Sequence, residues 1–150
     1  TKDISKAIKA SVEVYNEARE ELKKRDKDFS GNRSMEGGLV PNILNLEILN
    51  LLSKVCKKIG KKNRIEIGLG LDIAANDLWN GRRYEYKKFS KSESKKNLSK
   101  EEQIEYIRKL IKNYNLTYVE DPLEEEDFEG FRELNKGLGV ICGDDLIVQM

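Results

Sequence analysis

Carboxylates stand at the ends of three apolar segments, and they are the residues best suited to chemistry in this chain. "GLGLD" ends at Asp72, "TYVED" ends at Glu120 and Asp121, and "VICGDD" ends at Asp144 and Asp145. Carboxylates gathered in a partly dry setting repel one another. A bound cation removes that repulsion, and ligands that are all oxygen favour Mg²⁺ over zinc or copper. A single acid of this kind could equally cap a helix or face water.

The rest of the composition excludes some kinds of catalysis and argues against some classes of partner. The chain has no histidine, which excludes Ser-His and Cys-His catalysis within it and argues against zinc. Its 28 basic and 27 acidic residues give a net charge of +1, which argues against nucleic-acid or membrane partners. No apolar run approaches the roughly 20 residues that span a bilayer, and no signal peptide is evident. We expect both cysteines to be reduced and buried. These features favour a cytoplasmic protein.

The spacing of the apolar residues predicts four helices. The first is expected over residues 4–25, with Asp3 as the N-cap, and the second over about 46–59. The third is expected to begin at a capping box formed by Ser99 and Glu102, and the fourth is expected over 123–137. Gly60 is expected just past the end of the second helix, and Gly137 at the end of the fourth. The acids 124–127 are expected in the first turn of the fourth helix, where the helix dipole favours negative charge.

Three strands alternate with these helices and end near Asp72, at Glu120, and at Cys142 or Gly143. Alternating strands and helices predict an α/β fold with parallel strands, and both a doubly wound sheet and a (β/α)8 barrel fit this order. In either fold the carboxyl ends of the strands meet, so the strand-end acids are expected to lie together. We also expect a turn at Asn80-Gly81 and a short ribbon at 84–86. The Lys/Ser-rich stretch that follows is expected to be a mobile surface loop.

Four motifs, taken in order, resemble the enolase family. "MEGGLVPN" resembles the family's D-E-G-G-x-A-P-N loop, and "LGLDIAANDLWNGRRYEY" resembles its strand-end aspartate with A-A-S-E-F-Y and D-G-x-Y. "VEDPLEEEDFEGF" resembles I-E-D-P-F with its acidic continuation, and "GDDLIVQM" resembles G-D-D-L-x-V-T-N. The resemblance extends over essentially the whole chain, and the ordered set is more specific than any one motif.

This resemblance implies a fold and a domain organisation. Residues 1–150 would be a single incomplete domain, part of a (β/α)8 TIM-type barrel like the enolase C-terminal domain. The N-terminal capping domain and the last barrel strands would lie outside the chain. The fragment alone is then expected to be inactive, and the full-length protein is expected to be a homodimer, as enolases commonly are.

The resemblance also implies an activity, the reversible dehydration of 2-phosphoglycerate to phosphoenolpyruvate in glycolysis and gluconeogenesis, with Mg²⁺ as cofactor. Asp72, Glu120 and Asp144 would bind the Mg²⁺, and Glu36 would act as the acid that assists departure of the C3 hydroxyl. The family's general base, a lysine at the end of the next barrel strand, would lie beyond residue 150.

Asp121 and Asp145, each beside a ligand in the chain, would support the ligands. One departure bears on activity, because Met35 stands where the family has an aspartate beside the catalytic glutamate, and a thioether cannot ionise. The alternative is therefore a diverged enolase-like protein with a binding or scaffold role and no turnover.

Overall fold

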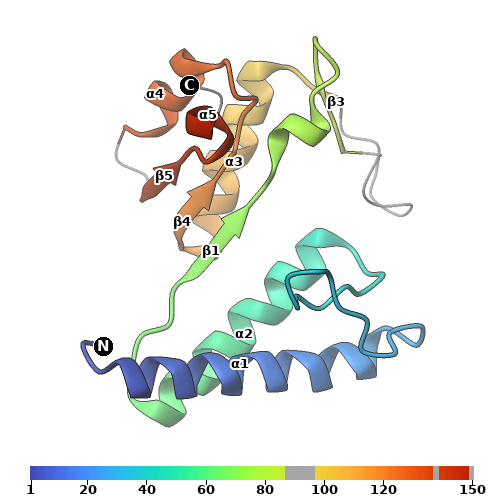
Figure 1. Cartoon of the computed structure of the whole chain (residues 1–150), viewed down its shortest axis with the longest axis vertical. Coiled ribbons are helices and arrows are strands. Elements are labelled where there is room, and N and C mark those ends of the chain that lie inside the picture. Colours follow the sequence, from blue (N-terminus) through green and yellow to red (C-terminus); the bar gives the residue numbers. More distant parts are fainter. Residues whose placement is uncertain (87–96, 137–138, 149–150) are drawn as a thin grey trace. The chain divides into compact units, whose positions relative to one another are not determined.

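The chain forms two compact units, Thr1–Ile67 and Gly68–Met150, each described here by itself. The computed structural model describes residues 1–86, 97–136 and 139–148 (Figure 1). The prediction that residues 1–150 form a single domain stays a prediction. A search of the described helices finds none that is long and apolar enough to cross a membrane.

The first unit is built on two helices that lie side by side, α1 (Ile4–Arg25) and α2 (Asn45–Asn63) (Figure 1). The prediction of α1 is confirmed, including the cap, because the Asp3 carboxylate accepts the backbone N–H of Lys6 at 3.1 Å. The apolar faces of both helices, with Phe29 from the loop after α1, form a buried core of Ala10, Ala18, Leu22, Phe29, Leu51, Val55 and Ile59. Burial of these faces, more than helix propensity, stabilises the pair.

The predicted end of the second helix at Gly60 is wrong, because α2 continues to Asn63 and Gly60 lies inside it. The left-handed residue that ends α2 is Arg64, with φ of 53°. The chain then folds back on the helix, and the N–H of Ile65 donates to the Gly60 carbonyl at 3.0 Å. A Cβ at Gly60 would lie 2.8 Å from the Ile65 carbonyl oxygen, so the glycine permits this close approach.

The second unit contains a parallel sheet of β1 (Leu69–Asp72), β4 (Leu116–Glu120) and β5 (Val140–Cys142), in the order β1-β4-β5. The prediction of parallel strands that end at these positions is confirmed. Helix α3 (Lys100–Tyr114) precedes β4 and packs against it (Figure 1). Val119 of β4 and Ile107 of α3 are almost fully buried, which places the core on this face of the sheet.

Short elements connect β1 to α3. They are the 3-10 helix η1 (Ala75–Leu78) and an antiparallel pair, β2 (Tyr84–Glu85) with β3 (Asn97–Leu98). The Asn80-Gly81 turn is confirmed by the N–H of Asn80, which donates to the Arg83 carbonyl at 3.1 Å. The capping box is also confirmed, since Ser99 and Glu102 each accept the other's backbone N–H. The predicted Lys/Ser-rich loop falls on 87–96, outside the described residues.

The prediction of an acidic first turn over residues 124–127 is wrong, because α4 (Phe128–Leu134) begins after these residues. Asp127 caps α4 by accepting the N–H of Gly130 at 3.0 Å. Glu124 is buried, and its Oε1 lies 2.6 Å from the ammonium of Lys100. The acids therefore pair with a lysine and cap the helix from outside it. Gly137, the predicted end of this helix, lies outside the described residues, and α4 ends at Leu134. A last short helix, α5 (Asp145–Val148), follows β5.

Candidate functional site

The sheet brings the predicted metal ligands of the second unit to one edge. Asp72 of β1 pairs in register with Glu120 of β4, and Glu120 pairs with Cys142 of β5. Asp144 follows Cys142 by two residues. Because side chains of paired residues in parallel strands point to the same face, Asp72 and Glu120 extend from the same side of the sheet. Glu120 is half-buried, whereas Asp72 and Asp144 are exposed.

Asp121 joins the three strand ends through its backbone. Its N–H donates to the Cys142 carbonyl of β5 and its carbonyl accepts the N–H of Ala75 after β1, each at 3.0 Å. Its φ of 39° lies in the left-handed region, which is unusual for a residue other than glycine. Backbone strain of this kind persists only where the surroundings impose it, and it gathers at functional sites.

The Asp121 side chain is buried and turns toward the residues that follow β5. Its Oδ1 accepts the N–H of Asp144 at 2.9 Å, and its Oδ2 accepts the N–H of Asp145 at 3.4 Å. Burial raises the pKa of this carboxyl, the negative charges of Asp145 and Asp72 raise it further, and the two N–H donors oppose the rise. Asp121 thus holds the backbone of Asp144, while its supporting role in a metal site stays a prediction.

Three of the strand-end carboxylates accept a hydrogen bond from a neighbour in the second unit. Oδ1 of Asp72 accepts the N–H of Ala74 at 3.0 Å, and Oε2 of Glu120 accepts the Tyr118 hydroxyl at 2.7 Å. Oδ2 of Asp145 accepts the Asn76 side-chain amide at 2.9 Å. These contacts fix one oxygen of each of these three carboxylates.

Asn76 is a site residue that the sequence reasoning missed. Its amide nitrogen lies 2.9 Å from both Asp145 Oδ2 and Glu125 Oε2, and its carbonyl oxygen accepts the N–H of Glu125 at 2.8 Å. It therefore links η1 to the segments that follow β4 and β5. Its place four residues after the strand-end Asp72 was the available signal, but no local pattern indicates partners so far along the chain.

The oxygen atoms of the strand-end carboxylates are of the kind that bind a hard cation, and the strand register brings them to the same edge of the sheet. Three carboxylates on neighbouring strand ends supply the oxygen ligands that Mg²⁺ prefers. Among the described residues, however, no three Asp, Glu or Cys side chains are already gathered closely enough to hold a metal ion. The strand ends thus bring these residues to one edge of the sheet, but their side chains do not converge on one point there.

Glu36 belongs to the first unit and lies in a tight turn between Ser34 and Gly38. The Ser34 N–H donates to the Gly38 carbonyl at 2.8 Å, and the Gly37 N–H donates to the Ser34 carbonyl at 3.0 Å. The Tyr15 hydroxyl of α1 donates to the Gly37 carbonyl at 3.2 Å and so fixes the turn to the helix. Glu36 is exposed, and Met35 beside it is fully exposed.

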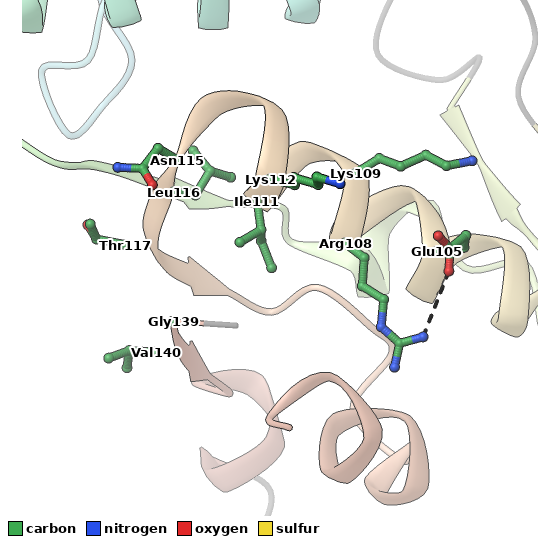
Figure 2. Close-up of a pocket in the computed structure, with 10 residues that line it drawn as sticks. All are labelled: Glu105, Arg108, Lys109, Ile111, Lys112, Asn115, Leu116, Thr117, Gly139 and Val140. Atoms are coloured by element: carbon green, nitrogen blue, oxygen red, sulfur yellow. Dashed lines mark ion pairs between the residues drawn. The ribbon is translucent and has the colours of Figure 1, made fainter. Parts of the chain in front are cut away.

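A cavity of about 810 Å³ lies at the opposite edge of the sheet from the strand-end acids (Figure 2). Its walls come from α3 and from the beginnings of β4 and β5, including Thr117 and Val140. Figure 2 shows Arg108 directed at Glu105, and their nearest charged atoms are 3.8 Å apart. The lining residues include none of the strand-end acids, so this cavity is separate from the candidate site.

Comparison with known proteins gives a consistent result over the whole chain. The family model described as "Enolase, C-terminal TIM barrel domain" matches residues 1–150. The enolase of Methanosphaera stadtmanae is 36% identical over 149 residues, which cover 97% of this chain and 35% of that protein. The enolases of Pyrobaculum aerophilum and Ehrlichia chaffeensis are 37% and 34% identical over 148 and 146 residues, covering 97% and 95% of this chain.

The chain spans about a third of the length of these curated relatives, 35%, 34% and 32% respectively. The family match confirms the predicted fold class, part of a TIM-type barrel with parallel strands and helices.

Proposed function

Because the chain belongs to the enolase family, through the C-terminal TIM barrel domain, we propose that it is part of a Mg²⁺-dependent enolase. The proposed reaction is the reversible dehydration of 2-phosphoglycerate to phosphoenolpyruvate, which makes the full-length protein a hydro-lyase. The proposed organisation is an incomplete barrel, whose capping domain and last strands belong to other parts of that protein. We also propose that the full-length protein is cytoplasmic and dimeric.

The observation that carries the proposal is the pairing of Asp72 with Glu120 at the carboxyl edge of the sheet, with Asp144 held beside them through Asp121. We propose these three carboxylates as the Mg²⁺ ligands. The bound cation would stabilise negative charge as it develops on the carboxylate oxygens of the substrate. Asp121 and Asp145 would keep the ligand-bearing backbone in place.

Glu36 is proposed as the general acid. Its carboxyl group would give a proton to the C3 hydroxyl, which leaves as water, while a base outside this chain takes the C2 proton. The turn that carries Glu36 is fixed to α1 by the Tyr15 hydroxyl, so the acid is presented on an anchored loop. A positioned acid of this kind typically contributes about 10²–10⁴ in rate.

The test is a calorimetric titration of the full-length protein with Mg²⁺, alongside an assay of phosphoenolpyruvate formation. Asp72→Ala and Asp144→Ala should each abolish measurable Mg²⁺ binding, because each removes one of three charged ligands. Asp77→Ala is the matched control, since Asp77 is an exposed acid in η1 outside the proposed ligand set. Unchanged binding in the two ligand variants would refute the assignment.

A second candidate function is an enolase-like protein that binds without turnover. The observation that favours it is Met35, fully exposed beside Glu36 and unable to act as an acid or a strong acceptor. Mg²⁺ binding without phosphoenolpyruvate formation would support this alternative. Met35→Asp should then create or increase activity, and its full exposure means that the substitution leaves the packing of the turn intact.

A further inference from the structure

Tyr118 makes a direct contact with one of the proposed ligands. Its hydroxyl donates to Oε2 of Glu120 at 2.7 Å. The two residues are two apart on β4, so their side chains point to the same face, while Val119 between them is buried on the other face. The phenol ring therefore extends along the strand toward the edge that carries the carboxylates.

The neighbouring strand provides the space for this ring. Gly70 of β1 pairs in register with Tyr118, and a Cβ at Gly70 would lie 3.3 Å from Cδ1 and 3.4 Å from Cβ of Tyr118. Contacts of 3.3 Å are tighter than a Cβ normally tolerates, so the ring would have to shift. Gly70, the second glycine in "GLGLD", therefore has a packing reason next to the candidate site.

An irregularity in the pairing of β1 with β4 lies directly before Tyr118. The register shifts between Leu69 and Gly70, which leaves Thr117 as the extra residue on β4. A Cβ at Gly68 would lie only 2.6 Å from Oγ1 of Thr117, so this glycine accommodates the irregularity. Bulges of this kind often re-aim a side chain beside an active site.

Strand β5 lies on the other side of β4 from β1. Cys142 pairs in register with Glu120, and Val140 of the same strand pairs with Tyr118. The Tyr118 hydroxyl is held against one oxygen of Glu120 on its own strand. The other oxygen of Glu120 remains for a cation.

We propose that Tyr118 is a positioning residue, which orients Glu120 as a cation ligand from a space that Gly70 leaves open. This inference rests on the proposed function, because it takes Glu120 to be a Mg²⁺ ligand. A glutamate held in place before binding loses less side-chain freedom when the cation arrives. Partners that orient metal ligands typically contribute about 10–100-fold in metal affinity.

The test is Mg²⁺ titration of full-length Tyr118→Phe by calorimetry, with circular dichroism to verify the fold. The Kd for Mg²⁺ should rise by about 10-fold or more, since the ring is kept and only the donor is lost. Raising the Mg²⁺ concentration should restore turnover, which a general structural defect would not allow. Tyr114→Phe is the matched control, a half-buried tyrosine near the end of α3.

Gly70→Ala provides a second, independent variant. The new methyl group should displace the Tyr118 ring and raise the Kd, but it should add little when combined with Tyr118→Phe. Equal Kd values for the wild type and Tyr118→Phe, or strictly additive effects in the pair, would overturn this inference alone. Absence of Mg²⁺ binding in the wild type would overturn the proposed function together with it.

Discussion

The Asp121 carboxylate accepts the backbone N–H of Asp144 at 2.9 Å and so connects the end of β4 to the residues that follow β5. Asp121 also accepts the N–H of Asp145 and donates its own N–H to the Cys142 carbonyl. The buried Asp121 therefore fixes the backbone position of Asp144, the third proposed ligand. Its left-handed backbone, with φ of 39°, is part of the same arrangement.

Removal of this carboxylate should weaken metal binding without removing any proposed ligand. Asp121→Ala leaves the N–H groups of Asp144 and Asp145 without their acceptor, so the loop after β5 should lose its position. We expect the Kd for Mg²⁺ of the full-length protein to rise by about 10–100-fold. Calorimetric titration measures this, with Asp77→Ala as the control. An unchanged Kd would contradict the positioning role.

Glu36 should be needed for turnover and dispensable for cation binding. Glu36→Gln removes the transferable proton while keeping the size of the side chain, so turnover should fall by about 10²–10⁴-fold. The Kd for Mg²⁺ should stay the same, because Glu36 is not among the proposed ligands. Phosphoenolpyruvate formation and calorimetry test the two parts separately. Glu66→Gln, at an exposed acid of the same unit, is the control, and retained turnover in Glu36→Gln would exclude the acid role.

The ion pair between Lys100 and Glu124 should add to the free energy of unfolding near neutral pH, and this contribution should disappear at alkaline pH. Burial opposes the charge of Lys100, but the hydrogen bond to Glu124 and the charges of Asp127 and Glu124 outweigh it and raise the pKa of Lys100. A raised folded-state pKa means that the contribution is complete below the pKa of unfolded lysine and is lost as the pH rises through the folded-state pKa.

Lys100→Met should therefore lower the free energy of unfolding by roughly 1 kcal/mol near neutral pH, since the lysine is more than a third exposed. Urea unfolding at neutral and strongly alkaline pH should show this difference shrinking toward zero. Lys112→Met, at an exposed position of the same helix, is the control. A difference that stays constant over that pH range would argue against the ion pair as its cause.

Gly60→Ala should reverse the usual effect of this substitution in a helix. Alanine normally stabilises a helix interior by about 1 kcal/mol relative to glycine. Here the added Cβ would lie 2.8 Å from the Ile65 carbonyl oxygen, so the backbone would have to move. We expect a loss of about 1–3 kcal/mol in the free energy of unfolding.

Asn50→Ala, at an exposed position in the same helix, should instead raise the free energy of unfolding by a few tenths of a kcal/mol. Urea unfolding of both variants gives the two signs directly. If both substitutions stabilise the protein, the close approach of Ile65 to Gly60 is not maintained in solution.

Local patterns were sufficient where neighbouring residues alone determine the structure. The helix from Ile4 to Arg25 follows from apolar spacing and the cap at Asp3, and the box of Ser99 with Glu102 begins α3 as expected. The acids at the ends of β1, β4 and β5 could also be located, because strands of apolar residues end where charge begins. All of these signals lie within a few residues of the feature that they predict.

Long-range contacts decided the rest, and no local signal reports them. Gly60 looks like a helix end, but it lies inside α2, where its missing side chain lets the backbone of Ile65 approach closely. The acids before α4 look like a first helical turn, but they precede the helix, and Glu124 among them is buried and paired with Lys100. Asn76 acquires its contact with Asp145, 69 residues along the chain, only when the strands align. The sequence thus determines which groups are available and where each strand ends, whereas packing determines which of them meet, because register and burial depend on residues far apart in the chain.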